Sequence, residues 1–89
     1  MHGHYRVELA ESAKRDLKKV SPQTKEDILT AIEELAEEPR PVGCKKVRGA
    51  DAYRIRVGAY RVIYQIFDVR LLILVVRVGH RREVYRGFG

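Results

Sequence analysis

The chain has 89 residues, of which 45% are hydrophobic and 34% are charged, and its formal net charge is +6. This composition predicts one globular domain over residues 1–89 and excludes a disordered chain. The longest apolar run, residues 71–76, is too short to span a bilayer, and we expect neither a signal peptide nor a membrane contact. Because Cys44 is the single cysteine, there is no internal disulfide and we expect a cytoplasmic location.

Basic residues concentrate in the second half of the chain. Residues 1–40 carry seven Lys/Arg against nine Asp/Glu, whereas residues 41–89 carry eleven against three. The first half therefore has a balance of −2 and the second a balance of +8. Such a concentrated basic region is typical of a protein that binds a polyanion, and both nucleic acid and an acidic protein partner fit it.

The first half predicts a strand followed by two helices. Apolar and polar residues alternate over residues 5–9, as in a half-buried strand, and the apolar residues of the stretch 11–20 recur at helical spacing. Ser21 and Pro22 suit the N-cap and the first position of a second helix, which we expect to run to about Glu38. The short joint between the helices predicts an antiparallel hairpin.

The second half predicts an antiparallel meander. A short strand over residues 44–47 precedes a hairpin in which Gly58-Ala59 forms a type II′ turn, so that Arg56 faces Arg61. The last long strand, residues 71–78, is continuously apolar and should lie in the interior of the sheet. The fold class is therefore α+β, a two-layer sandwich in which an N-terminal strand, a helical hairpin and an antiparallel meander pack together.

Three arginines should share the face of this sheet that points away from the helices. Period-two alternation places Arg54, Arg56 and Arg61 on that face, with Arg56 and Arg61 directly opposite each other. Like charges in opposed positions destabilise a sheet. A bound anion would offset the repulsion between the opposed arginines. We therefore predict an anion site here, and we interpret the anion as an RNA backbone.

Several short motifs resemble those of the RelE/ParE toxin superfamily, and of its RelE branch in particular. They are Lys-Val-Arg-Gly (46–49), Tyr-Arg-Ile-Arg (53–56), Tyr-Arg-Val-Ile-Tyr (60–64), Val-Gly-His-Arg (78–81) and Val-Tyr (84–85). The resemblance implies the toxin of a type II toxin–antitoxin module. It further implies a metal-independent endoribonuclease, an mRNA interferase without a cofactor that cleaves mRNA in the ribosomal A site by attack of the 2′-hydroxyl.

The same resemblance implies partners and leaves two other functions open. A small acidic, RelB-like antitoxin should silence the toxin, and operator DNA should be contacted only through the antitoxin complex. ParE-type relatives keep the fold, inhibit DNA gyrase and lack the catalytic basic set. A weakly active toxin that acts mainly as an antitoxin-bound autorepressor is the third alternative.

The resemblance places the catalytic set on Arg54, Arg56, Arg61, Arg81 and Tyr85. The best-known members have lysines where Arg54 and Arg56 stand. Because arginine does not give up its proton, the general base stays open between Tyr85 and His80.

Other basic residues of this half are expected to bind RNA. They are Lys45, Lys46, Arg48, Arg77, Arg82 and Arg86. The face on which Arg77 lies depends on register, since a slip of one residue moves it to the opposite face. No metal site is expected, because the histidines and Cys44 have no metal-binding spacing.

Overall fold

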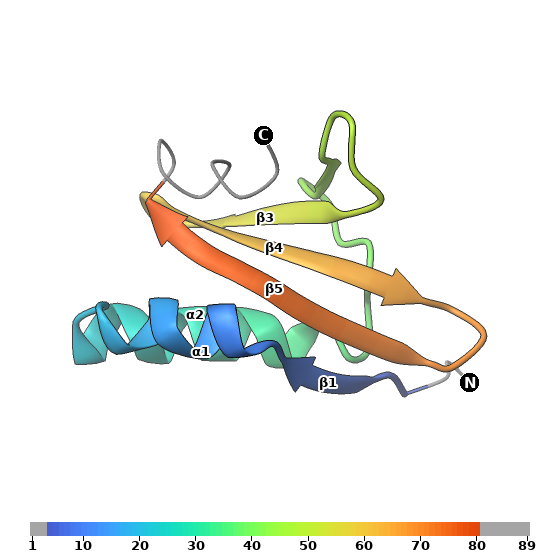
Figure 1. Ribbon diagram of the computed structural model, residues 1–89. Coiled ribbons are helices and arrows are strands. Elements are labelled where there is room, and N and C mark those ends of the chain that lie inside the picture. Colours follow the sequence, from blue (N-terminus) through green and yellow to red (C-terminus); the bar gives the residue numbers. More distant parts are fainter. Residues whose placement is uncertain (1–3, 81–89) are drawn as a thin grey trace.

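The protein is described by a computed structural model over residues 4–80, and Figure 1 shows its two layers. Both helices lie beneath one face of a five-stranded sheet with the strand order β1-β5-β4-β3-β2. The elements are β1 (Arg6–Leu9), α1 (Glu11–Lys18), α2 (Pro22–Glu34), β2 (Lys45–Lys46), β3 (Tyr53–Val57), β4 (Tyr60–Phe67) and β5 (Leu72–His80). Strand β1 is parallel to β5, and the other pairs are antiparallel. The predicted α+β class is confirmed.

The hairpin of β3 and β4 has the predicted register. Val57 pairs with Tyr60, and Arg56 pairs with Arg61. Gly58 has a φ of 62°, whereas the φ of Ala59 is not positive, which is the pattern of a type II′ turn. The turn therefore fixes which residues of both strands share a face.

The main core lies between the helices and one face of the sheet. Its fully buried members include Ile28 from α2, Val62 and Tyr64 from β4, and Ile73 from β5. The Tyr64 hydroxyl donates a hydrogen bond of 2.7 Å to the carbonyl oxygen of Pro39, so its one polar atom is satisfied inside the core. Burial raises the pKa of this hydroxyl.

Helix α2 ends at Glu34, four residues before the predicted end at Glu38. The next residues form tight turns, in which the backbone N–H groups of Leu35 and Ala36 bond three residues back. Both side chains are buried, and the Ala36 carbonyl accepts a 2.8 Å hydrogen bond from the N–H of Tyr5, the residue just before β1. Packing and this contact with β1 therefore stop the helix before Pro39 is reached.

Helix α1 covers the part of β5 that extends beyond β1. The pairing of β1 with β5 ends at Val75. Further along, the Ser12 hydroxyl donates to the Val76 carbonyl at 2.6 Å, and the Val78 N–H donates to the Asp16 carboxylate at 2.9 Å. Side chains of α1 thus replace a neighbouring strand along this edge.

A second apolar cluster covers part of the face of the sheet opposite the helices. Val47, Ala52 and Ile63 are buried there, and Ala50 and Val76 pack against them. The segment 47–52 therefore folds over one part of this face, which was expected to carry the arginines. This explains why β5 is apolar on both sides.

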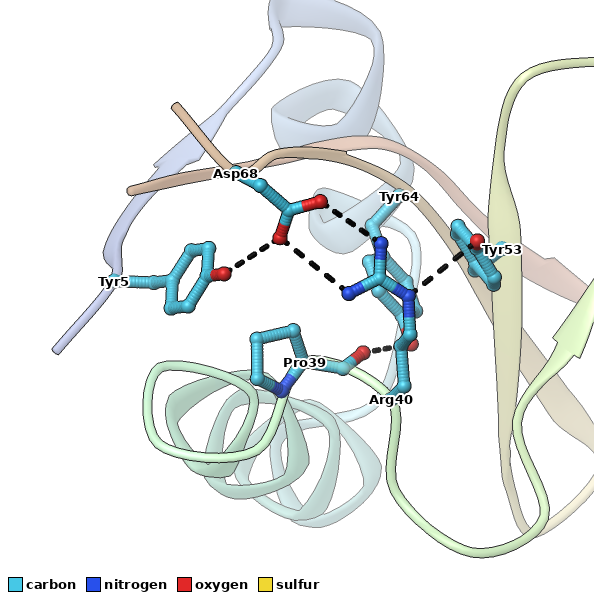
Figure 2. A network of polar contacts seen from close by, with 6 residues as sticks. All are labelled: Tyr5, Pro39, Arg40, Tyr53, Tyr64 and Asp68. Atoms are coloured by element: carbon cyan, nitrogen blue, oxygen red, sulfur yellow. Dashed lines mark hydrogen bonds and ion pairs between the residues drawn. The ribbon is translucent and has the colours of Figure 1, made fainter. Parts of the chain in front are cut away.

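Arg40 contacts side chains from two other segments of the chain, Tyr53 and Asp68, as Figure 2 shows. Its guanidinium contacts both carboxylate oxygens of Asp68 at 3.1 and 3.4 Å and lies 5.2 Å from the centre of the Tyr53 ring. Tyr5 donates to the same carboxylate at 2.6 Å. The Arg40 and Tyr5 hydrogen bonds hold the pKa of Asp68 below its ordinary value. The contacts anchor the linker that leads from α2 to β2.

Candidate functional site

Arg54, Arg56 and Arg61 share the sheet face that points away from the helices, and we call this surface the arginine face. The alternate β3 residues Tyr53, Ile55 and Val57 pack on the main core, so Arg54 and Arg56 point to the other side. Arg61 joins them because it stands directly opposite Arg56. The predicted grouping of these three residues is therefore present in the structure.

The arginine face combines positive charge with an apolar border. Arg56 is exposed and Arg54 is half-buried, and neither takes part in the ion pairs found among residues 4–80. Arg54 stands opposite Ile63, which is fully buried in the second apolar cluster. Charge at the border of an apolar region is less screened than charge in open water, which strengthens its attraction for an anion.

The neighbouring basic residues divide between the two sides of the sheet. Lys45 pairs with Arg54 and shares the arginine face, whereas Lys46 pairs with Tyr53 and points to the helix side. Arg48 is exposed on the segment 47–52. Lys45 and Arg48 thus extend the basic surface along one border of the arginine face.

Arg77 stands opposite Ile63 in the sheet, but its guanidinium is bonded to a carboxylate of α1. A register shift between β4 and β5 leaves Val76 without a partner, which is the pattern of a β-bulge. Beyond it, the Arg77 guanidinium forms a 2.8 Å ion pair with Asp16 of α1. A side chain that was predicted to bind RNA is therefore held by a carboxylate of helix α1.

His80 is also separated from the arginines. It pairs with Tyr60, and the two rings meet edge to face with their centres 6.0 Å apart. Because Tyr60 packs on the main core, the imidazole lies on the helix side of the sheet. The predicted residues Arg81, Arg82, Tyr85 and Arg86 lie outside the described part of the chain. Within residues 4–80, no three metal-ligating side chains gather at one place.

A groove that was not predicted lies beside the outer edge of β3. It has a volume of about 620 Å³, and we call it the β3-edge groove. Residues of α2 and its following turn, the linker and the sheet edge line it: Ala31, Glu34, Leu35, Glu38, Pro41, Val42, Gly43, Lys45, Arg54, Ile55 and Arg56. One indication of the groove was present in the sequence: Glu34 and Glu38 are four residues apart and so share one face at the end of the predicted helix.

The chain matches a known family over most of its length. The family model described as the ParE toxin of type II toxin–antitoxin system, parDE, matches residues 7–85. The chain belongs to the RelE/ParE toxin superfamily. Neither helix in the described part of this toxin is long and apolar enough to cross a membrane.

Relatives within the superfamily carry RelE-type names. Toxin RelG of Mycobacterium tuberculosis is 37% identical over 92% of this chain and 97% of its own length. The mRNA interferase toxin RelE of Escherichia coli is 31% identical over 91% of this chain and 90% of its own. In the crystal structure of the toxin–antitoxin complex RelBE2 from M. tuberculosis, the matched chain has a TM-score of 0.79 and 31% identity, with 88% of this chain and 99% of that chain covered.

Proposed function

We propose that this toxin is an endoribonuclease that cleaves mRNA in the ribosomal A site and thereby inhibits translation in the cytoplasm. The observation that carries the proposal is the grouping of Arg54, Arg56 and Arg61 on one sheet face, including a directly opposed pair. The relative named as an mRNA interferase supports this choice among the activities of the superfamily.

The reaction uses the ribose 2′-hydroxyl as the nucleophile. Its oxygen loses its proton and attacks the adjacent phosphorus, the bond to the 5′-oxygen breaks, and the departing oxygen takes up a proton from water, which leaves a cyclic phosphate and a free 5′-hydroxyl. Negative charge grows on the phosphate oxygens in the transition state, and preorganised donors aimed at that charge commonly give the largest contribution to catalysis. Planar guanidinium groups suit this role because each can donate to two oxygens. Arg54, Arg56 and Arg61 supply these donors.

Proton transfer needs a different residue. Arginine stays protonated in proteins and cannot accept the proton of the 2′-hydroxyl. His80 faces Tyr60 on the other side of the sheet, so we do not assign this role to it. We assign it to Tyr85, together with Arg81 as a further phosphate ligand, from the resemblance to the RelE branch.

The RNA strand extends from the arginine face along the sheet border. Lys45 shares that face and Arg48 is exposed beside it, so both are in place to contact flanking phosphates. Lys46, Arg82 and Arg86 stay predictions as further backbone contacts. A RelB-like antitoxin holds the toxin silent, and operator DNA is contacted only through that complex.

Primer extension on mRNA from cells that express the toxin tests the proposal. We expect cuts within codons at the A site, and we expect Arg56→Ala and Arg61→Ala to abolish them. His80→Ala is the matched control and should leave the cuts in place. An intact message in cells arrested by the wild-type toxin would overturn the proposal.

The description of the matching family model favours a second candidate. It names a ParE toxin, and toxins of that type inhibit DNA gyrase without chemistry of their own. A supercoiling assay with purified gyrase separates the two. Inhibition of gyrase together with normal translation on purified ribosomes would establish the second function in place of the first.

A further inference from the structure

Gly79 stands beside Arg61 on the arginine face. The two residues pair across β4 and β5, and cross-strand partners point to the same side of a sheet. Val78, the residue before Gly79, is buried in the main core, so position 79 points to the opposite face. Arg56, Arg61 and Gly79 therefore form one row across three adjacent strands, in which two cations are followed by a position without a side chain.

The backbone does not require a glycine at this position. Among the glycines between residues 4 and 80, the positive φ values belong to Gly43, Gly49 and Gly58, whereas Gly79 lies in the ordinary extended part of β5. Its register is regular, because the pairs on both sides of it are in place. Glycine weakens a strand, since it adds entropy to the unfolded chain and has no side chain to pack. A side chain here would stabilise the strand, so its absence has another cause.

The space next to Gly79 is open toward the edge of the sheet. The segment 47–52 packs on Ile63, which lies two residues further along β4 than Arg61. The pairing of β1 with β5 stops at Val75, so β1 does not reach this end of β5. Gly79 keeps part of its surface exposed, and it lines a hollow of about 250 Å³ at this edge.

The backbone of Gly79 is directed into the sheet, so the position offers a ligand room and no free donor. The Val78 N–H points outward and donates to the Asp16 carboxylate at 2.9 Å. Backbone groups alternate in direction along a strand, so those of Gly79 point toward β4 and Arg61. A side chain at position 79 would have its Cβ about 4.5–5.5 Å from that of Arg61 and would stand beside the arginine stem.

We propose that Gly79 shapes the substrate site by leaving open the place beside Arg61 that the sugar and phosphate of the RNA strand occupy. The inference rests on the proposed function in taking the ligand to be RNA. A guanidinium donates to two oxygens of one phosphate only when the phosphate lies next to it in the plane of the fork. A branched side chain at position 79 would occupy that place and hold the strand further from Arg61. Because a displacement of about 1 Å can cost roughly 100-fold in rate, position 79 controls cleavage as well as affinity.

A series of side chains of increasing size at position 79 tests the proposal. Gly79→Ala and Gly79→Val should melt at or above the wild-type temperature, because an extended backbone suits both residues. Gly79→Val should lower single-turnover cleavage on purified ribosomes by about 100-fold, and Gly79→Ala should lower it less. Gln65→Val is the matched control and should keep the wild-type rate. Gln65 follows the core residue Tyr64, so this variant places the same side chain on the same face of β4, four residues from Arg61.

The dependence on Arg61 separates a role in substrate binding from a structural role. In titrations with a non-cleavable 2′-deoxy oligonucleotide, Gly79→Val should weaken affinity at least about tenfold when Arg61 is present, and less than about twofold in an Arg61→Ala toxin. A structural effect would be the same in both backgrounds, and equal losses would therefore overturn the proposal.

Two further results would also overturn it. One is a folded Gly79→Val toxin that binds the oligonucleotide and cleaves mRNA as the wild type does. The other is a lowered melting temperature of Gly79→Ala, which would show that the fold itself needs the glycine. If the unmodified toxin does not cleave, while its affinity for the oligonucleotide still depends on Gly79 and Arg61 together, the nuclease proposal alone is refuted.

Discussion

Arg56 of β3 and Arg61 of β4 are directly opposed across the hairpin, on the face of the sheet that the helices leave uncovered. The type II′ turn at Gly58 sets this pairing, so the two guanidinium groups are brought together by the backbone. The like charges oppose folding, and in the proposed function they bind a phosphodiester. The proposed function would account for a pair that lowers the stability of the fold.

Replacement of Arg56 by glutamine should stabilise the protein. The change removes the repulsion from Arg61 and keeps a side chain of similar length, so we expect the free energy of unfolding to rise by about 0.2–1 kcal/mol. Urea denaturation at low and high salt measures it, and the gain should shrink as salt screens the repulsion. Arg70→Gln removes an equal charge from the exposed β4–β5 turn and is the control. A loss of stability in Arg56→Gln at low salt would contradict the account.

Arg77 and Arg56 should differ in their contribution to RNA binding. Each basic residue that neutralises a phosphate adds close to one unit to the slope of log affinity against log salt, so Arg56→Gln should lower that slope by about 1. Arg77→Gln should leave it unchanged, because its guanidinium is held by Asp16. Titration of a non-cleavable oligonucleotide at several salt concentrations gives both slopes. If a folded Arg77→Gln variant also shows a reduced slope, Arg77 contacts an RNA phosphate and this prediction is wrong.

Asp16 should be important for stability although it lies on a helix rich in charged residues. Its carboxylate pairs with Arg77 and accepts the Val78 N–H, and only 15% of its side chain is exposed. Asp16→Ala leaves both donors without this acceptor, so we expect a loss of about 1–3 kcal/mol in the free energy of unfolding. Asp16→Asn keeps an acceptor oxygen and should lose less. Glu26→Ala, an exposed change on α2, should have almost no effect in the same denaturation experiment.

The ion pair of Arg40 with Asp68 should make stability depend on acid pH. Hydrogen bonds from Arg40 and Tyr5 lower the pKa of Asp68 in the folded state (Figure 2). The pair therefore stabilises the fold above the ordinary aspartate pKa of about 3.9, and this stabilisation is lost as the pH falls through the lower folded-state value. Asp68→Asn should lower the melting temperature at pH 7, and the difference from wild type should vanish at the acid end of a pH series. A difference that persists there would show that charge is not its origin.

Local patterns predicted the hairpin but not the bulge beside it. The alternation of Arg54, Ile55 and Arg56, together with the two-residue turn at Gly58, determined the register correctly. The continuous apolar run of β5 gave no such signal, because every residue in it fits either face. The skipped residue Val76 therefore escaped prediction, and with it the ion pair of Arg77 with Asp16.

Contacts between distant segments set the other differences. Helix α2 stops early because Ala36 is buried and bonded to Tyr5, about thirty residues away in the chain. The cluster of Val47, Ala52 and Ile63 joins a loop to a strand and has no local periodicity. The β3-edge groove likewise depends on where the linker leaves the sheet, which no single segment specifies.

The rate of mRNA cleavage on purified ribosomes, measured in a single turnover at saturating toxin, tests the central claim most directly. If the arginine face stabilises the charge of the reacting phosphate, Arg61→Ala should lower this rate by about 100-fold or more, while Arg70→Ala keeps the wild-type rate. Circular dichroism would show that both variants are folded. A folded Arg61→Ala toxin that cuts the message at the wild-type rate would contradict the account.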